Sequence, residues 1–567
     1  MKRLLLLALA IQSGIFASAA EKAGVPPLSP FGIGSCYING RSMEDNARWV
    51  PQMEEIGLTA FRTPHTDWGA VEPEEGKWAW EALDKQMKYL DEHKFVYGAL
   101  LIGTPGWNKK DAGGTLPVNN LAGWSNYVTE LTKHLKGRVK RFEVWNEPPN
   151  FTGKDQTPED YAKLVVASYK AVKAVDPNAL VGLAAKSAHI NYLEQVIKAG
   201  AKDHFDYIVL HPYECLDGLT ENNGSEAVFM NIVPTLRKML AAQNPAKAKV
   251  PVIFTELGID AKKGTERQAG GLVKAYTLGI AQGVECIQWF EGRDGDSGPM
   301  GLLDGEGKPR PAYTALGQMI KHLGQHPTYL GWLLLKDKHY GFVFKGAAGN
   351  VLVSWAANGK PDTLDLGKEL QAVDPLTGKV TAAKSIELTS TPVLLLGPPD
   401  DLVAKAKANK GKLFPWNGDF TNAKSVSITY GEKTEEKGLH TRSGTALAEA
   451  VVAYGGSARS GDVPGGNVFM VDPNFLSYTP TPIEITAVVR RKEGNENAGF
   501  KLVYESTKGF ETSGGWYTVP DNKEWHTVKW QIDNPQFVNY WGYNFVLESD
   551  GNTYNKYYIQ SVTVTKR

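Results

Sequence analysis

The chain has 567 residues, of which 42% are hydrophobic and 22% are charged. This length provides for two or three domains with large cores. Lysine and arginine (62) balance aspartate and glutamate (62) with no long basic run, which argues against nucleic acid and anionic membranes as partners. Three cysteines without paired spacing argue against a disulfide framework or a zinc cluster.

The first residues have the pattern of an export signal. A charged pair, Lys2 and Arg3, precedes the apolar stretch 4–11 and a small-residue cleavage site at 17–19. We expect residues 1–19 to be a signal peptide and the mature protein to be secreted or periplasmic. No cysteine stands directly after the cleavage site, where a lipid would be attached, and no later run is long and apolar enough for a bilayer span, so we expect no membrane anchor. The oligomeric state is not indicated.

Strand and helix patterns then alternate through residue 323. The helices have apolar residues three and four apart, and the strands are short apolar runs between turn residues. The expected strands are 31–35, 58–62, 95–101, 141–147, 180–183, 207–213, 250–257 and 285–290. The expected helices are 46–56, 81–92, 122–135, 158–175, 191–199, 228–242, 267–283 and 312–323. This alternation predicts an α/β fold, a (β/α)8 TIM barrel over 20–325. A doubly wound sheet is the alternative, but no glycine-rich phosphate turn follows the first strand.

The remaining sequence is dominated by β patterns. Residues 326–398 predict a small β-sandwich, and the polar stretch 399–412 predicts a linker or a short exposed helix. Residues 413–567 predict a C-terminal jelly-roll sandwich. Its last third is rich in aromatic residues, which either stack on sugars, as in a carbohydrate-binding domain, or pack its core. They are Trp516, Tyr517, Trp525, Trp530, Tyr540, Trp541 and Tyr543.

Two of the barrel strands end in a glutamate. Alternation along 141–148 puts Glu143, Trp145 and Glu147 on one face, and the strand at 250–258 delivers Glu256. Functional side chains of a parallel barrel project from the C-terminal ends of its strands, so both carboxylates are expected to meet at one site. Paired carboxylates across a small cleft are suited to cleaving a glycosidic bond. The other interpretation is that each is a solvated strand-end residue.

The sequences around these glutamates resemble a known superfamily. Trp-Asn-Glu-Pro at 145–148 and Thr-Glu at 255–256, on the fourth and seventh strands, are similar to the acid/base and nucleophile strands of clan A retaining glycoside hydrolases. The resemblance covers residues 31–323. The appended β-sandwich and the segment 301–313 look like family 39, whose members are β-xylosidase-like, and family 5 has the same type of barrel.

This resemblance implies roles for two catalytic residues. Glu147 is expected to act as general acid and then base, and Glu256 as nucleophile, with the carboxyl groups about 5 to 5.5 Å apart. Repulsion between them is expected to raise the proton affinity of Glu147. We expect no cofactor and no metal, because the calcium-loop-like stretch 294–298 lacks the glutamate at its twelfth position.

Five further residues are expected to bind substrate. Arg62, if it reaches Glu256, would keep it ionised, although Arg62 could instead pair with Glu143. Tyr213 would donate a hydrogen bond to Glu256, and Asn146 would bind a sugar 2-hydroxyl. The two remaining members of the set are His211 and Trp289, which match sugar-site positions of the clan. Trp289 would form the apolar floor under the sugar ring. For both residues the alternative is that they pack in the core.

The expected function is that of a secreted retaining glycoside hydrolase that cleaves β-glycosidic bonds of poly- or oligosaccharides by double displacement. Two alternatives remain open. One is a non-catalytic carbohydrate-binding protein, and the other is a transglycosylase that uses the same site. The sequence does not indicate which sugar or linkage is recognised, or whether cleavage is exo or endo.

Overall fold

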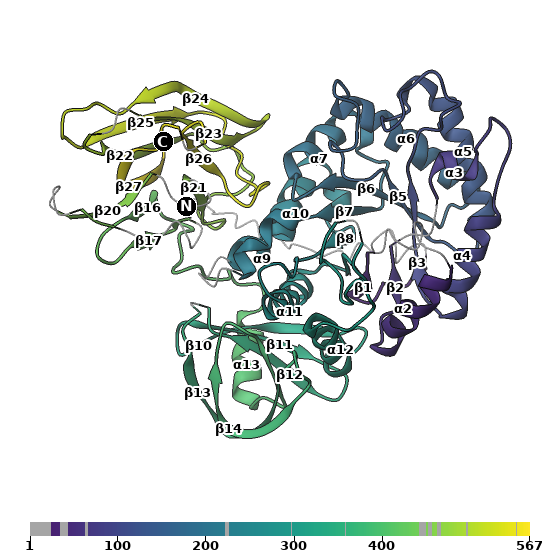
Figure 1. The fold of residues 1–567 in the computed structure, drawn as a ribbon, viewed down its shortest axis with the longest axis horizontal. Coiled ribbons are helices and arrows are strands. Elements are labelled where there is room, and N and C mark those ends of the chain that lie inside the picture. The colour runs from purple at the N-terminus through teal and green to yellow at the C-terminus, as the bar shows by residue number, and fades with distance from the viewer. Residues whose placement is uncertain are drawn as a thin grey trace, which may run out of the picture.

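The structure is a computed structural model. It describes residues 24–34, 43–62, 66–220, 226–295, 297–357, 359–441, 449–451, 456–461, 467–494, 497–551 and 553–567. The expected signal peptide and Cys36 lie outside these residues. Figure 1 shows a helix-covered barrel in purple to teal, a β domain in green and a C-terminal β domain in yellow-green. Among the helices described, none combines the length and apolarity that a membrane span requires.

The first part is a closed parallel barrel. Its nine strand segments are hydrogen-bonded in the order β3-β2-β1-β9-β8-β7-β6-β5-β4. Since the two end segments β3 and β4 follow each other around Gly98, they form one interrupted strand, and the barrel is eightfold as predicted. The segments are β1 (Phe31–Ile33), β2 (Ala60–Phe61), β3 (Val96–Tyr97), β4 (Ala99–Leu101), β5 (Arg141–Val144), β6 (Leu180–Lys186), β7 (Tyr207–His211), β8 (Val252–Leu257) and β9 (Cys286–Trp289).

The barrel helices agree closely with the sequence prediction. One example is α6, which begins with a capping box between Thr157 and Asp160 and has Pro158 in its first turn. The principal helices are α2 (Met43–Glu55), α4 (Glu81–Glu92), α5 (Leu121–Leu135), α6 (Pro158–Val175), α7 (Ile190–Val196), α10 (Ile232–Gln243), α11 (Thr265–Gln282) and α12 (Pro311–Leu323). Shorter helices are α3 (Trp68–Val71), α8 (Asp217–Thr220) and α9 (Glu226–Met230).

The barrel has an inner and an outer core. The inner cluster is small and is closed at the N-terminal end of the strands by Val25 and Leu28. The large outer cluster fills the space between strands and helices. Side chains of one strand divide between the two clusters: on β8, Ile253 is in the inner cluster and Phe254 in the outer one.

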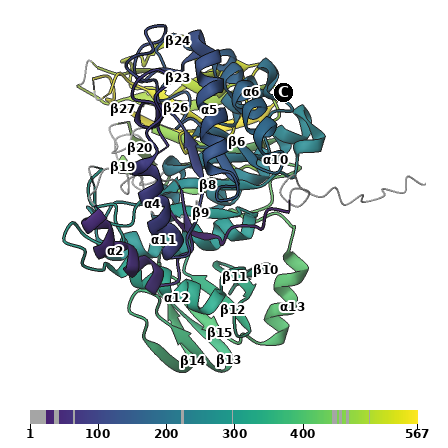
Figure 2. The same cartoon turned by 90° about the vertical axis from the view of Figure 1, so that its right-hand side faces the viewer.

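The second part is one antiparallel sheet in the order β10-β11-β12-β15-β13-β14. Its members are β10 (Thr328–Leu335), β11 (His339–Lys345), β12 (Asn350–Trp355), β13 (Asp362–Val373), β14 (Val380–Leu388) and β15 (Val393–Leu396). Phe342 and Trp355 join the barrel's outer cluster, whereas Val343 packs with Val403 and Ala406 of α13 (Asp400–Asn409). Figure 2 shows α13 beside β10. The segment expected to be a linker or exposed helix is therefore a helix that covers this sheet, because two of its side chains complete the domain's core.

The third part consists of two antiparallel sheets around a core of its own. One contains β16 (Ser425–Thr429), β17 (Glu435–Lys437), β19 (Glu449–Val451), β20 (Gly456–Ser460), β22 (Ile483–Arg491), β25 (His526–Ile532) and β27 (Tyr557–Lys566). The other contains β18 (Leu439–Thr441), β21 (Asn467–Val471), β23 (Gly499–Ser506), β24 (Gly509–Thr518) and β26 (Phe545–Glu548). The expected sandwich is confirmed. The jelly-roll strand order and carbohydrate binding by this domain stay predictions.

Candidate active site

Both glutamates lie at the C-terminal ends of barrel strands, but neither continues a regular strand. β5 ends at Val144, and the backbone then adopts positive φ at Trp145 (63°) and Glu147 (49°). In β8 the pairing with β9 shifts register between Phe254 and Leu257, next to Glu256. Such irregular backbone is sparsely populated, costs on the order of 1–3 kcal/mol per residue and concentrates at functional sites. Each irregularity turns a glutamate side chain away from the direction that a regular strand would give it.

Glu256 is held by two hydrogen-bond donors. Arg62, at the end of β2, donates from Nη1 to Glu256 Oε1. Tyr213, which follows β7, lies with its hydroxyl 3.2 Å from Glu256 Oε2 and donates to it. The first contact is an ion pair, and together the two contacts fix the orientation of the carboxylate. The Glu256 side chain is 12% exposed, so it is largely desolvated and still reachable.

Arg62 also binds Glu143, so both interpretations of this arginine hold together. Its Nη2 lies 2.6 Å from Glu143 Oε1 and 2.6 Å from Asn146 Oδ1. The second bond occupies the oxygen of Asn146 and leaves its amide N–H donors directed away from the arginine. Arg62 thereby links the two strands that carry the glutamates.

Glu147 contacts His211 at the end of β7. His211 Nδ1 is 2.9 Å from Glu147 Oε1, and its Nε2 is 2.8 Å from Thr255 Oγ1. Thr255 in turn donates its hydroxyl proton to Glu143 Oε1 at 3.3 Å, because a carboxylate oxygen only accepts. The threonine oxygen then accepts from His211 Nε2, and Nδ1 of a neutral His211 carries the lone pair that faces Glu147. Glu147 and His211 can therefore share one proton across this contact.

The two glutamates are close to each other. One oxygen of Glu147, one of Glu256 and a nitrogen of His211 all lie within 4.8 Å of one another. Inverting glycosidases need carboxyl groups about 6.5–9.5 Å apart, whereas retaining enzymes have them about 5–5.5 Å apart. The separation here agrees with the retaining arrangement.

The pKa of Glu147 has the opposite direction to the one expected from carboxylate repulsion. Burial alone would raise this pKa. The hydrogen bond and charge of His211, with the charges of Lys186 and Arg62, together hold it below its ordinary value. The contact with His211 and the nearby positive charges outweigh the effect of burial, a balance that composition and spacing do not reveal.

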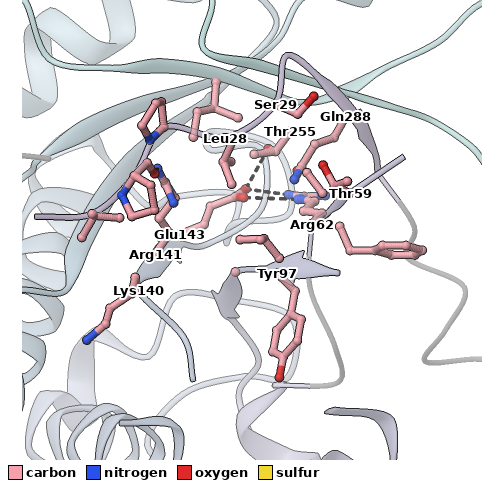
Figure 3. Close-up of a pocket in the computed structure, with 18 of the residues that line it drawn as sticks. Leu28, Ser29, Thr59, Arg62, Tyr97, Lys140, Arg141, Glu143, Thr255 and Gln288 are labelled. Carbon is pink, nitrogen blue, oxygen red and sulfur yellow. Dashed lines mark hydrogen bonds and ion pairs between the residues drawn. The ribbon is translucent and has the colours of Figure 1, made fainter. Parts of the chain in front are cut away.

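A cavity of about 200 Å³ lies in the barrel interior next to this site, toward the N-terminal end of the strands. Figure 3 shows Arg62, Glu143 and Thr255 joined by hydrogen bonds on its wall, with Gln288 beside them. Glu147 and Glu256 do not line it. Glu143 is thus a buried barrel residue below Glu147 and Glu256, and its two bonds to Arg62 position that arginine.

Trp289 does not occupy its expected place. It is fully buried and stacks on Tyr276 of α11, with ring centroids 6.3 Å apart. Its neighbour Gln288 faces the barrel interior, so alternation turns Trp289 outward to the helices. Phe290 instead meets Tyr213 edge to face, at a centroid distance of 6.5 Å. The expected apolar floor at Trp289 is therefore wrong, and Phe290 is the aromatic residue on the side of Tyr213.

Trp145 is also turned away from the carboxylates. It is 2% exposed, packs near Trp124 of α5 and donates from Nε1 to Phe151 O at 2.8 Å. These contacts stabilise the positive φ of the turn. Of the expected site residues, the structure brings together Arg62, Asn146, Glu147, His211, Tyr213 and Glu256, and leaves out Trp289.

Sequence reasoning missed two polar residues near Glu147. Lys186 ends β6, and its backbone N–H donates to Pro148 O at 3.0 Å, which ties β6 to the turn behind Glu147. Glu214 follows Tyr213, and its Oε2 is buried without a hydrogen-bond partner among the described residues. Burial raises the pKa of Glu214. Their positions at strand ends were the available signal, but neither lies in a recognisable motif.

Comparisons with known proteins concern the barrel that carries these residues. Residues 81–260, which include Glu147 and Glu256, match the model of glycosyl hydrolases family 39. No curated protein sequence matches the chain. A family 39 glycoside hydrolase from the gut symbiont Bacteroides cellulosilyticus WH2 superposes with a TM-score of 0.53 at 19% identity, over 65% of this chain and 81% of that one.

Two further solved structures have lower scores. Xylanase 10B from Thermotoga maritima has a TM-score of 0.39 at 16% identity, over 54% of this chain and 98% of that chain. An exo-β-1,4-mannosidase from Opitutaceae bacterium strain TAV5 has a TM-score of 0.41 at 15% identity, over 52% of this chain and 59% of that chain. The expected resemblance is confirmed by the family match and by the fold of the Bacteroides enzyme. Over residues 81–260 the chain is similar to glycosyl hydrolases family 39.

Proposed function

We propose that the protein is a retaining β-glycosidase that acts on poly- or oligosaccharides, with Glu147 as acid/base and Glu256 as nucleophile. The observation that carries this proposal is that oxygens of the two carboxylates lie within 4.8 Å of each other. That separation leaves no room for a water between carboxylate and sugar, so the second carboxylate attacks directly.

The assignment of roles follows from the different partners of the two glutamates. Glu256 accepts hydrogen bonds from Arg62 and Tyr213, which fix its carboxylate for attack as a nucleophile. Glu147 instead faces Nδ1 of His211, and this contact can hold the proton that an acid delivers. A proton held there is available to the leaving oxygen even though nearby cations lower the pKa of Glu147.

The reaction then has two displacements. Glu256 attacks the anomeric carbon while Glu147 gives its proton to the leaving oxygen, and a glycosyl ester forms on Glu256. Glu147, now a carboxylate, removes a proton from water, which attacks the same carbon and releases Glu256. Asn146, whose oxygen is fixed by Arg62, would donate its amide N–H to the 2-hydroxyl of the sugar as positive charge develops on the ring.

The stereochemistry of the product tests this mechanism. A panel of aryl β-glycosides identifies a substrate, and NMR then follows the anomer that appears first. We expect the β anomer before mutarotation, and a 2-deoxy-2-fluoro analogue of that substrate should label Glu256. An α product, or labelling elsewhere, would reject the retaining assignment.

We further propose that residues 1–19 direct export of the protein. The support is the charged start, apolar stretch and small-residue cleavage site of this segment. N-terminal sequencing of protein recovered outside the cytoplasm should begin at residue 20 or 21. Recovery of chains that still begin with Met1 would contradict the proposal.

A further inference from the structure

The C-terminal domain is docked rigidly against the barrel on the α7 and α10 side (Figure 1). Met470, Tyr478 and Val538 of this domain belong to the same buried cluster as the barrel's outer core. Across the same boundary, Asn191 Nδ2 donates to Ser506 O at 3.1 Å and to Gln536 O at 3.3 Å. A domain that shares a core with the barrel has a fixed position relative to the active site.

One loop of this domain, residues 535–544, reaches the barrel strand ends beside Glu147. Ser187 Oγ donates to Tyr540 O at 2.6 Å, and Ser187 also forms a β-bridge with His211, the residue that contacts Glu147. A Cβ on Gly542 would lie 2.4 Å from Glu214 O, so only glycine permits this approach.

The loop is held in shape from within its own domain. Glu505 is buried, and its carboxylate accepts hydrogen bonds from the backbone N–H groups of Val538 (2.9 Å), Asn539 (3.0 Å) and Tyr540 (2.6 Å). Asn544 Nδ2 adds a fourth at 2.8 Å. A loop fixed by a single buried carboxylate presents its side chains with little conformational entropy left to lose.

Those side chains form an aromatic wall beside the acid. Tyr540 stacks on His189 with ring centroids 3.7 Å apart, and Trp541 lies 4.8 Å from the Tyr540 ring. Lys186 Nζ sits 4.8 Å from the centre of the Trp541 ring. Trp541 is only partly buried, so its ring remains available to a ligand. Near it, Glu214 Oε2 is a buried oxygen without a partner among the described residues.

We propose that this wall, made by Tyr540 and Trp541 with Lys186 and Glu214, binds the sugar unit that leaves when the bond is cleaved. The inference rests on the proposed function, because it assumes that Glu147 protonates the leaving oxygen. A pyranose has apolar C–H faces that stack on an indole ring and hydroxyl groups that pair with an ammonium and a carboxylate. The ligand class is therefore the leaving part of an oligosaccharide, and the C-terminal domain helps to select it.

The test compares two substrates that share the same transferred sugar. One is a β-linked oligosaccharide, and the other is the β-glycosyl fluoride, which has no leaving sugar. For Trp541→Ala we expect the ratio of kcat/KM for oligosaccharide to kcat/KM for fluoride to fall about tenfold or more. Trp541→Tyr should restore most of the ratio. The matched control is Trp516→Ala, which removes a tryptophan of the same domain that is 44% exposed on β24, and should leave the ratio at the wild-type value.

Lys186→Met approaches the wall from the barrel side and keeps the test decisive if the Trp541 variant does not fold. Both substrates are then compared at a pH below the alkaline limb of each variant, where the change in the pKa of Glu147 has no effect, and the ratio should still fall. An unchanged ratio in the folded variants, or an equal loss with both substrates, would overturn the inference. Failure of the proposed function gives a different result, since the wild-type protein would then hydrolyse neither substrate.

Discussion

Glu147 and Glu256 have different surroundings, and the difference matches the different roles proposed for them. Glu256 is fixed from two sides by Arg62, which forms an ion pair with it, and by the hydroxyl of Tyr213. Glu147 stands on a turn with positive φ and faces Nδ1 of His211. One carboxylate is thus held in place by donors on two sides, and the other faces a ring nitrogen through which a proton can pass.

The two surroundings also differ in how they continue into the molecule. The contacts of Glu256 lead down through Arg62 to Glu143 and Thr255 in the barrel interior. The contacts of Glu147 lead outward through His211 and Ser187 to the loop of the C-terminal domain. The proposed nucleophile and the proposed acid are therefore supported by different parts of the fold, and each can be disturbed separately.

The largest effect is expected at the nucleophile. Glu256→Gln removes the attacking oxygen, and kcat should fall on the order of a thousandfold or more for every substrate. The fall should not depend on the leaving group, because the ester cannot form. Steady-state kinetics with a series of aryl β-glycosides measures this. Near-normal turnover of any member would remove Glu256 from the mechanism.

A smaller and selective loss is expected at the acid. Glu147→Gln should lower turnover on the order of a hundredfold for substrates whose leaving group needs a proton. Aryl glycosides with acidic phenols should lose much less in the bond-breaking step. The slope of log kcat/KM against the pKa of the leaving group should therefore become steeper than in wild type. An equal loss across the series would mean that Glu147 does not protonate the leaving oxygen.

Arg62→Met sharpens the comparison because it acts on the Glu256 side. The substitution leaves Glu143 and Glu256 near each other without the cation that pairs with both. This should destabilise the fold by about 3–5 kcal/mol and lower kcat about ten- to a hundredfold. Denaturant unfolding and kinetics measure the two effects. Arg62→Lys, which keeps the charge but not the fork of donors, is the control and should recover part of both.

Lys186→Met also acts on the Glu147 side, through the charge that it removes. The charge of Lys186 lowers the pKa of Glu147, so its removal should raise that pKa. Because the acid must be protonated, activity is lost as pH rises through its pKa, and the alkaline limb of kcat/KM should move to higher pH by less than about one unit. Lys186→Arg keeps the charge and should leave the limb in place. A limb that moves to lower pH in Lys186→Met would contradict the stated direction.

The sequence was sufficient for the barrel and for the pairing of the glutamates, since regular strand and helix periods define both. The sequence also predicted correctly that the Glu147 side chain faces the site. The reason given there, regular alternation along the strand, does not hold. Alternation would place Trp145 and Glu147 on the same side, but positive φ at both residues turns Trp145 to the helices and Glu147 to the site. Backbone irregularity of this kind depends on tertiary contacts such as the bond from Trp145 to Phe151, which periodicity does not contain.

The contribution of the C-terminal domain could not be predicted for a different reason. Tyr540 and Trp541 stood out in composition, and the sequence could suggest either sugar binding or core packing for them. Which barrel loop they meet depends on how one domain docks on the other. The contacting residues Ser187 and Tyr540 are about 350 residues apart along the chain. No local pattern encodes a contact of that separation.

The smallest effect on activity is expected from Trp289→Phe, which tests the outward placement directly. The side chain of Trp289, the last residue of β9, is fully buried against Tyr276 of α11. A smaller ring removes packing there and should lower the free energy of unfolding by about 0.5–3 kcal/mol. Because the side chain does not face the carboxylates, kcat and KM should stay within about twofold of wild type. Phe290→Ala is the matched variant, since Phe290 packs against Tyr213 and its loss should raise KM or lower kcat. If Trp289→Phe instead impaired turnover while leaving stability unchanged, the tryptophan would have to face the sugar, and the parity of β9 derived from Gln288 would be wrong.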